Sequence, residues 1–452
     1  LDITDALKSG ENTLVVEARD DTRSWLQPSG KQSVWYVSAG CHYTRVTGIW
    51  QTVWLERAGA SRVDAFRVNA DAASGCVSLM PQISGLCGGL SLAVKVLRGG
   101  KAVSGVETPV QGFTGQVCLC VPEAELWEPG NPALYDVEIS LGRNGKVVDS
   151  VRGYFGFRSI GLDGAAITLN GKPLFQRLVL DQGYYPDGIY TASRDGALKK
   201  DVEISQAMGF NGARLHQKVF EPRFLYWCDR LGYIVWGEYP SWGLDTSLPG
   251  AMAALVPEWT EAVLRDYNHP SIVGWCPLNE TSASQDPYLL RTTQRLTKSL
   301  DPTRPCIDTS GYVHVETDVY DSHDYTQNPH ELKKHFAAFA KGGEPWYNRQ
   351  EDARYAGQPY FVSEFGGAWW APGRKAGWGY GERPKTAAEF IKRYKGLASV
   401  LLKHPRMAGF CYTQLYDVEQ ERNGLYYYDR RPKFDPKVIA AINCQKAAIE
   451  KK

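Results

Sequence analysis

The sequence predicts a multidomain protein in which two β-rich parts precede a C-terminal (β/α)8 barrel, also called a TIM barrel. The chain has 452 residues, enough for two or three domains and a large hydrophobic core. Up to about residue 157, short runs of alternating apolar and polar residues are separated by Gly-rich turns, as in β-sheets. Beyond residue 158, apolar runs alternate with amphipathic helical patterns, which is typical of a parallel sheet.

The first 58 residues predict one strand at 12–18, after a turn at Gly10, and another at 47–56. Two strands are too few to close a sandwich. We therefore expect missing N-terminal residues or the neighbouring domains to complete the sheet. Otherwise an exposed edge remains for a partner, such as a second copy in a homo-oligomer. The chain begins at Leu1 without Met or a signal peptide, so we expect it to be a fragment.

The next hundred residues, 59–157, continue in the β pattern. Strands are predicted at 62–68, 90–97, 115–121 and 135–140, with Gly-rich turns between them. Roughly seven short strands in about 100 residues predict an immunoglobulin-like sandwich.

From residue 158 onward the pattern predicts eight strands in about 290 residues, the content of a (β/α)8 barrel. The predicted strands are 174–179, 212–215, 233–236, 271–280, 305–308, 318–322, 360–364 and 407–412. The predicted helices are 194–208, one after Pro222, 252–267, 287–299 and 436–450.

Two of these strands end in a carboxylate. The fourth strand runs into Asn279 and Glu280, and the seventh runs into Glu364. A buried strand has no packing reason to end in polar residues, whereas barrel strands point their last side chains into the active-site mouth. Two carboxylates on nonadjacent strands are the groups that a retaining glycosidase uses.

The composition argues against a nucleic-acid-binding, membrane-spanning, zinc-binding or disulfide-rich protein. The net charge of +1 leaves no electrostatic footprint for nucleic acid or an anionic membrane. No apolar run approaches the roughly 18 residues of a membrane span. Ten cysteines without a C-x-x-C pair indicate neither a zinc site nor a compact disulfide framework, and they favour a reducing compartment such as the cytoplasm. The 14 Trp and 25 Tyr fit either a large aromatic core or stacking on sugar rings.

Five short stretches resemble glycoside hydrolase family 2, the family of β-galactosidases, β-glucuronidases and β-mannosidases. These stretches are 47–51, 265–271, 278–280, 363–366 and 429–433, and the resemblance extends over nearly the whole chain. It implies the C-terminal part of a jelly-roll sandwich at 1–58, an immunoglobulin-like sandwich at 59–157 and a catalytic TIM barrel at 158–452. The family's jelly roll is longer than 58 residues, so its first half is expected to be missing.

The resemblance also implies that Glu280 is the acid/base and Glu364 the nucleophile. The acid/base protonates the leaving oxygen and later deprotonates water, whereas the nucleophile must be ionised to attack the anomeric carbon. Arg214 matches the family's strand-two arginine and would keep a carboxylate ionised. Asn279 would hydrogen-bond the 2-hydroxyl of the sugar. Ordinary ion pairing is the alternative interpretation of these charged residues.

Other polar residues near strand ends are further candidates for binding the substrate. His216 lies two residues beyond Arg214, and Glu238 ends the third strand, so each could contact a sugar hydroxyl. His323 and Tyr325 end the sixth strand. The resemblance implies a tyrosine near here that hydrogen-bonds the nucleophile, although the local spacing departs from the family's common pattern.

Aromatic residues complete the set of expected substrate contacts. Tyr412 ends the eighth strand, where a ring can form the floor of the sugar site. Trp369 and Trp370 follow Glu364 on a predicted loop, and two exposed Trp there predict contact with a ligand. Together with the loop after Trp236, they are expected to narrow the mouth to one sugar, which would give exo action.

No metal or other cofactor is indicated by the sequence. His314, Asp318, Asp321 and His323 are close together in the chain, but their spacing matches no ligand pattern. Some β-galactosidases of the family that this chain resembles use magnesium beside the acid/base. No equivalent ligands stand out here, so binding of a divalent cation is possible but not indicated by the sequence. His269 lies at the predicted bottom of the barrel and is expected to be structural.

A stretch after the eighth strand bears on which sugar the protein would bind. Family members that cleave glucuronides carry an Asn-x-Lys pair there to hold the carboxylate. Here Asn423 is present but Leu425 replaces the lysine, which disfavours a glucuronide unless Arg422 substitutes. A β-galactoside is therefore the default carbohydrate substrate, with β-glucuronide, β-mannoside, α-L-arabinopyranoside and β-glucoside as alternatives. A non-catalytic carbohydrate-binding protein and a metal-dependent barrel hydrolase are alternatives of other classes.

Overall fold

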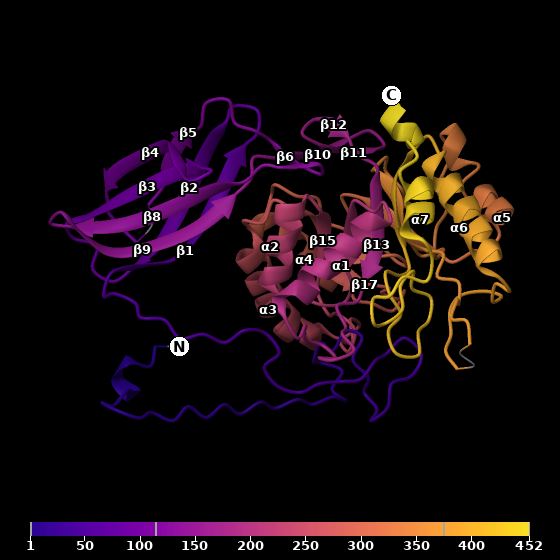
Figure 1. Ribbon diagram of the computed structural model, residues 1–452, viewed down its shortest axis with the longest axis horizontal. Coiled ribbons are helices and arrows are strands. Elements are labelled where there is room, and N and C mark those ends of the chain that lie inside the picture. The colour runs from indigo at the N-terminus through magenta and orange to yellow at the C-terminus, as the bar shows by residue number, and fades with distance from the viewer. Residues whose placement is uncertain (1, 114, 374–375, 452) are drawn as a thin grey trace.

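The computed structural model describes residues 2–113, 115–373 and 376–451. Three regions follow one another along the chain: a long N-terminal segment, a pair of β-sheets packed as a sandwich, and a parallel β/α barrel (Figure 1). The predicted order of β-rich sheets followed by a barrel is thus confirmed. No helix within the described part of the chain is both long and apolar enough to cross a membrane.

The N-terminal segment, residues 2–58, differs from its prediction. Its only helix or strand among the described residues is the 3-10 helix η1 (Thr4–Ala6). The strands predicted at 12–18 and 47–56 do not form, and apolar side chains within them are exposed, including Val15 at 83% and Trp54 at 72%. The physical reason is that no described strand pairs with their backbone. Alternation alone therefore does not produce a strand here.

The sandwich consists of two antiparallel sheets. One contains β1 (Arg62–Asp71), β2 (Cys76–Ser84) and β5 (Val117–Cys120) in the order β1-β2-β5. The other has the order β4-β3-β8-β9, with β3 (Leu90–Arg98), β4 (Lys101–Pro109), β8 (Tyr135–Arg143) and β9 (Lys146–Phe155). Alternate residues of β3 and β8 face inward, and they build a core separate from that of the barrel.

Short strands connect the sandwich to the barrel. They are β6 (Trp127–Glu128), β7 (Asn131–Pro132), β10 (Ile160–Asp163), β11 (Ala166–Leu169) and β12 (Lys172–Pro173). The indole of Trp127 is fully buried and donates a hydrogen bond of 2.8 Å to the carbonyl of Asp229. The carboxylate of Asp229 also pairs with His269 at 2.5 Å, and it accepts a hydrogen bond from Tyr154 of β9. His269 thus holds the two domains together, in agreement with the structural role expected for it.

Seven parallel strands of the barrel form one sheet, in the order β16-β15-β14-β13-β21-β20-β19. Their bounds are β13 (Gln176–Asp181), β14 (Gly212–Leu215), β15 (Ile234–Glu238), β16 (Ile272–Cys276), β19 (Tyr320–Asp324), β20 (Tyr360–Phe365) and β21 (Met407–Tyr412). The two edges meet through β17 (Leu278–Asn279) and β18 (Thr309–Ser310), which pair in parallel. Just before them, Trp275 bridges to Cys306, whose carbonyl accepts the N–H of Asp318 at 3.0 Å.

Helices alternate with these strands and cover the outside of the barrel (Figure 1). They are α1 (Asp195–Ala207), α2 (Pro222–Leu231), α3 (Met252–Asp266), α4 (Pro287–Leu300), α5 (Pro329–His335), α6 (Ala387–Leu402) and α7 (Pro436–Asn443), with 3-10 turns η2 (Pro249–Ala251), η3 (Phe339–Lys341) and η4 (Ala448–Lys451). Four of them begin with Pro, whose fixed φ suits the first helical position. The last predicted helix, 436–450, is shorter than expected, and α5 and α6 were not predicted.

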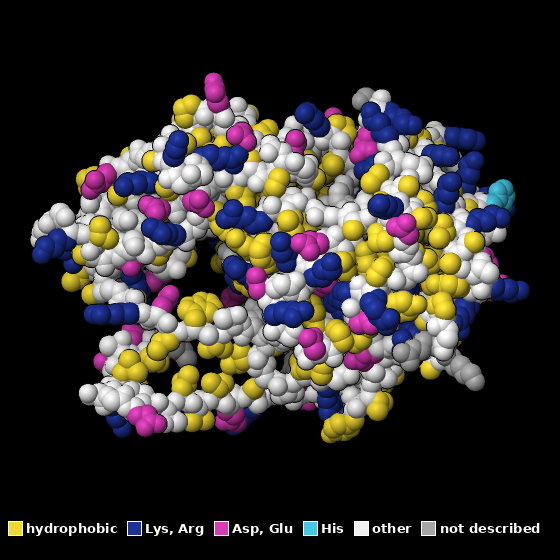
Figure 2. Space-filling view, in the orientation of Figure 1, with side chains coloured by type: hydrophobic (Ala, Val, Ile, Leu, Met, Phe, Trp, Pro, Cys, Tyr) yellow, Lys and Arg dark blue, Asp and Glu magenta, His cyan; other side chains and the backbone are white. Residues whose placement is uncertain are grey.

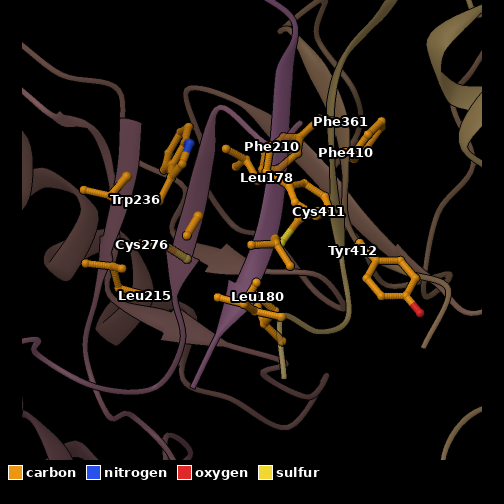
Figure 3. Packing of buried hydrophobic residues seen from close by; sticks show 14 of the residues in the cluster. Leu178, Leu180, Phe210, Leu215, Trp236, Cys276, Phe361, Phe410, Cys411 and Tyr412 are labelled. Carbon is orange, nitrogen blue, oxygen red and sulfur yellow. The ribbon is translucent and has the colours of Figure 1, made fainter. Parts of the chain in front are cut away.

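The barrel core combines large side chains with glycines that accommodate them. On β15 and β16, a Cβ at Gly274 would lie 2.3 Å from the ring of Trp236, and a Cβ at Gly237 would lie 2.6 Å from the ring of Trp275. Each Trp therefore fills the space left by a glycine on the neighbouring strand. The close-up in Figure 3 shows Trp236, Leu178 and Phe361 among the buried side chains of this core, and the rings of Trp236 and Phe361 stack with their centroids 5.9 Å apart. This packing fixes the strands whose ends carry the polar residues described next.

Candidate active site

Two carboxylates and a histidine converge at the carboxyl ends of the barrel strands. Glu280 directly follows β17, His323 lies in β19 and Glu364 lies in β20. One ligand atom from each of the three residues lies within 4.8 Å of the others. Glu280 adopts a positive φ of 52°, which is unusual for a residue with a side chain, and its N–H donates to the carbonyl of Ser310 at 2.9 Å. Such locally strained backbone is typical of functional sites.

Glu364 is held as an anion although its side chain is only 5% exposed. Arg214 of β14 donates to its Oε1 at 3.0 Å, and the hydroxyl of Tyr325 donates to its Oε2. Burial alone would raise the pKa of this carboxyl. The positive charges of His323 and Arg214 outweigh burial, and the pKa of Glu364 falls to about 2. Glu364 is therefore ionised throughout the neutral pH range.

Arg214 is the organising cation of the site. Besides Glu364, it contacts the Oε1 of Glu238 at 2.7 Å and donates to the Oδ1 of Asn279 at 3.0 Å. Burial opposes its charge, but the carboxylates of Glu238 and Glu364 raise the pKa of Arg214 well above its ordinary value. Because the Asn279 oxygen accepts from Arg214, the amide nitrogen of Asn279 remains as a donor.

Glu280 is joined to Glu364 through His323. The Nδ1 of His323 lies 2.8 Å from the Oε1 of Glu280, and its Nε2 lies 3.6 Å from the Oε1 of Glu364. Burial would lower the pKa of His323, but the charge of Glu364 and the hydrogen bond with Glu280 raise it. The raised pKa favours a positive charge on His323, and that charge would reduce the repulsion between the two carboxylates. The side chain of Glu280 is 19% exposed and borders a cavity of about 610 Å³.

His216 and Glu238, which we expected to bind sugar hydroxyls, are enclosed beneath the site. Each side chain is only 1% exposed, and the Oε2 of Glu238 lies 3.2 Å from the Nδ1 of His216. That oxygen also accepts the N–H of Gln217 at 3.1 Å. Burial holds the pKa of His216 well below its ordinary value, so Arg214 and His323 carry the positive charge around Glu364. The prediction of direct sugar contacts is replaced by a supporting role beneath Arg214.

Tyr412 does not form the floor of the barrel. Its ring packs against Tyr394 of α6, with centroids 5.0 Å apart, and its side chain points away from Cys411 (Figure 3). The prediction was wrong because successive strand residues face opposite sides. Cys411 takes the inward position, and the charges of Arg214 and Glu364 influence its pKa, which burial raises.

The two tryptophans after β20 also differ from their prediction. Trp370 is not exposed, because it packs against Phe390 and Phe434. Trp369 is partly buried, with the guanidinium of Arg383 4.4 Å from its ring centroid. No contact between Trp369 and the catalytic carboxylates is found among the described residues.

Part of the N-terminal segment, residues 25–44, lies across the mouth of the barrel, which the sequence did not predict. Ser29 donates to the carbonyl of Trp242 at 2.7 Å, and Gln420 donates to the carbonyl of His42 at 2.9 Å. Trp25 and His42 help to line the cavity beside Glu280. These contacts are polar and involve loops, so no periodic signal in the sequence indicates them. The segment nevertheless forms one wall of the site.

A chain of hydrogen bonds links this segment to the loop after β21. Tyr43 donates to the Oε2 of Glu421 at 2.6 Å, and Asn423 donates to its Oε1 at 2.9 Å. Gln414 donates to Asn423, and Gln182 donates to Gln414, both at 2.8 Å. Glu421, with a pKa that burial raises, is a functional candidate that sequence reasoning missed.

The residues that could hold a metal are the same three that converge at the strand ends. Glu280, His323 and Glu364 could offer three ligand atoms, but Arg214 already neutralises Glu364, which disfavours a second cation. The second group of potential metal ligands, which the sequence places between residues 314 and 323, does not converge on one point. His314 pairs with Asp308 at 2.8 Å and Asp321 at 3.0 Å. Asp318 pairs instead with Lys298 at 2.9 Å.

Models of one protein family match two parts of this chain. Residues 90–158 match Glycosyl hydrolases family 2, and residues 163–437 match Glycosyl hydrolases family 2, TIM barrel domain. A putative β-glucuronidase of Formosa agariphila is 27% identical over 293 residues, which are 62% of this chain and 34% of that protein. A β-galactosidase of Psychromonas ingrahamii is 32% identical over 196 residues, which are 41% of this chain and 18% of that protein.

Among solved structures, a β-glucuronidase from Ruminococcus gnavus in complex with D-glucuronic acid has a TM-score of 0.70 to this chain at 18% identity. The match covers 85% of this chain and 68% of that one, and it supports the fold. The chain spans about a third or less of the length of the two curated relatives.

Proposed function

The chain belongs to glycoside hydrolase family 2, and on that premise we propose that it is a retaining exo-β-glycosidase. The observation that carries the proposal is the convergence of Glu280, His323 and Glu364 within 4.8 Å at the carboxyl ends of the strands. Retaining enzymes place their two carboxyl groups about 5–5.5 Å apart, whereas inverting enzymes need about 6.5–9.5 Å. The close approach of the two glutamates favours retention.

The proposed reaction has two displacements. In the first, the ionised Glu364 attacks the anomeric carbon, and the bond to the leaving oxygen breaks as that oxygen takes the proton of Glu280. In the second, Glu280 removes a proton from water, which attacks the anomeric carbon and releases Glu364 as a carboxylate. Neither step needs a cofactor.

The surrounding groups fit these roles. Arg214 and Tyr325 hold Glu364 ionised and oriented for attack, since one contacts each carboxylate oxygen. The amide nitrogen of Asn279 is available to donate to the 2-hydroxyl of the sugar, a contact that strengthens in the transition state. His323 positions the carboxyl of Glu280 through the 2.8 Å contact between its Nδ1 and the Oε1 of Glu280.

We also propose the domain assignment that family membership implies. Residues 59–157 form an immunoglobulin-like sandwich, which the seven strands in two sheets support. Residues 1–58 are part of a jelly roll, and residues 158–452 are the catalytic TIM barrel. Homo-oligomerisation remains an expectation for this chain.

For the sugar, a terminal β-uronide is the first candidate and a β-galactoside the second. The relatives divide, since two of those named above are β-glucuronidases and one is a β-galactosidase. This favours the uronide more than the motif after β21 suggested. Neither residue considered there supplies a cation to the site: Leu425 is fully buried in the core, and the side chain of Arg422 packs on Gly377. A cation would have to come from elsewhere in the chain.

A panel of 4-nitrophenyl glycosides tests the proposal. We expect hydrolysis of at least one β-glycoside, loss of that activity in Glu364→Gln, and no effect of a chelator. Hydrolysis of no member by the wild-type chain would overturn the proposed activity. Activity that disappears with chelation would instead favour a metal-dependent hydrolase.

A further inference from the structure

A lysine of the N-terminal segment packs on Trp242, which lines the cavity beside Glu280, and it has no hydrogen-bonding partner among the described residues. Lys31 is only 7% exposed, and its Nζ lies 4.3 Å from the ring centroid of Trp242. No acceptor among the described residues lies within hydrogen-bonding distance of this Nζ. Its neighbour Gly30 has a φ of +56°, and a Cβ there would lie 2.3 Å from the carbonyl oxygen of Gln217. The glycine therefore allows the chain to bring Lys31 close to the barrel.

The surroundings of Lys31 place it beside the catalytic groups. Trp242, which it overlies, donates to the carbonyl of Asn279 at 3.2 Å and lines the same cavity as Glu280. Burial would lower the pKa of Lys31, but interactions with Cys41 and with the carboxylates of Glu421, Glu364 and Glu280 raise it. Lys31 is therefore a charged ammonium at neutral pH. Its three donors have no fixed acceptor on the protein.

Glu421 does not act as the direct partner of this ammonium. Its two carboxylate oxygens accept hydrogen bonds from Tyr43 and Asn423. Glu421 stays near enough to favour the charge on Lys31, while the ammonium donors are left for another acceptor.

We propose that Lys31 binds the carboxylate of the substrate sugar, which makes the substrate a terminal β-uronide. The inference rests on the proposed glycosidase function and names the substrate class of that same site. A nearly buried ammonium facing a neutral sugar would lack a charged partner, whereas a uronate carboxylate supplies a charge-assisted hydrogen bond. The residue that recognises the carboxylate thus comes from the N-terminal segment and not from the loop after β21.

Other buried lysines near the barrel mouth are already engaged. Lys433 pairs with Asp417 at 2.6 Å, and its side chain is fully buried. Lys218 donates to the carbonyls of Gly183 and Tyr190, both at 2.7 Å. Arg214 is occupied by four acceptors beneath the site, which belong to Glu238, Asn279, Ser363 and Glu364. These groups cannot take a carboxylate without giving up an existing partner, whereas Lys31 has no such partner among the described residues.

The test compares kcat/KM for 4-nitrophenyl β-D-glucuronide, β-D-galacturonide and β-D-galactoside. The variants are Lys31→Met and, as a matched control, Lys172→Met, which removes an exposed lysine of β12. We expect the wild type to prefer a uronide. Lys31→Met should lose about 10–100-fold on that uronide, mainly through KM, and change the galactoside by less than about threefold. Lys172→Met should change neither substrate.

The outcomes separate this inference from the proposed function. A wild type that cleaves the galactoside but no uronide, or a Lys31→Met variant that loses equally on all substrates, overturns the role of Lys31 and leaves the glycosidase intact. A wild type without activity on any glycoside overturns the proposed function first. If Lys31→Met fails to fold, inhibition of the wild type by free sugars tests the inference instead. Tighter inhibition by D-glucuronate than by D-glucose supports the inference, and equal inhibition overturns it.

Discussion

The barrel and the N-terminal segment show two different relations between sequence pattern and structure. In the barrel, seven of the eight predicted strands form, and their apolar residues are buried in one core. The eighth, predicted at 305–308, makes only a single bridge between Cys306 and Trp275. In the N-terminal segment, equally apolar stretches around Val15 and Trp54 form no strand and stay exposed. Figure 2 shows hydrophobic side chains on the surface along this segment, at the lower left. The difference teaches that alternation becomes a strand only where the chain also supplies a partner for its backbone.

The two regions also divide the work of the site. The barrel supplies both glutamates that we propose as catalytic, with Arg214 and His323 in contact with them. The segment supplies Lys31 and Tyr43 from residues held by loop contacts. A defect in the barrel should therefore abolish catalysis, whereas changes in the exposed parts of the segment should have little effect. The predictions below test this contrast in order of decreasing effect.

Removal of the nucleophile should have the largest effect. Glu364→Gln keeps the size of the side chain but removes the charge that attacks the anomeric carbon. We expect kcat/KM to fall roughly 10⁴–10⁶-fold for every substrate, the range seen when a member of a catalytic unit is lost. Steady-state assays on the cleaved nitrophenyl glycoside measure this. A loss below tenfold would assign the nucleophile elsewhere.

Removal of the acid/base should depend on the leaving group. Glu280→Ala should lower the rate about 10²–10⁴-fold for an alkyl glycoside, whose leaving oxygen needs a proton. A nitrophenyl glycoside, which leaves without protonation, should be affected less in the glycosylation step. Azide should then accelerate turnover, because it attacks the intermediate without a general base. Equal losses on both substrates, insensitive to azide, would leave Glu280 without this role.

The low pKa of Glu364 predicts a pH-dependent contribution to stability. Because its pKa falls to about 2 on folding, the contribution is complete above the ordinary carboxyl pKa and is lost as pH falls toward the folded value. Between pH 5 and pH 3 the wild type should lose about 1–2 kcal/mol more unfolding free energy than Glu364→Gln. Denaturant titrations at several pH values measure it. Parallel pH profiles for both proteins would contradict the proposed ion pairing.

Substitution in the exposed part of the N-terminal segment should have the smallest effect. Val15→Ser should change the free energy of unfolding by less than about 0.5 kcal/mol, because the side chain is 83% exposed. As the contrasting control, Leu178→Ala in β13 should cost about 2–5 kcal/mol, since Leu178 is fully buried. Similar losses for both would mean that the segment is packed in solution.

The barrel was predictable because its signals are local. The carboxylates at the ends of two predicted strands identified Glu280 and Glu364 as candidate site residues. The strands at 212–215 and 407–412 have the predicted bounds. The sequence did not predict as well which way individual side chains point. Tyr412 and Cys411 are neighbours on one strand, and only the register of the sheet decides which one faces inward. Nor does the sequence reveal that Glu238 and His216 lie beneath Arg214, because that arrangement depends on three strands meeting.

The wall formed by residues 25–44 could not be predicted for another reason. Lys31, His42 and Tyr43 lie in a stretch without periodicity, and the loops that they contact are distant in the sequence. Their positions follow from single hydrogen bonds such as that between Tyr43 and Glu421, 378 residues apart. Long-range polar contacts of this kind leave no pattern within either stretch.

The stereochemistry of the first product tests the central claim most directly. When ¹H NMR follows hydrolysis of a cleaved nitrophenyl β-glycoside from its first minutes, two displacements at Glu364 predict that the β-anomer of the sugar appears first. The α-anomer should then accumulate only as fast as mutarotation allows. A first product with the α configuration would mean a single displacement by water, and would contradict the assignment of Glu364 as nucleophile.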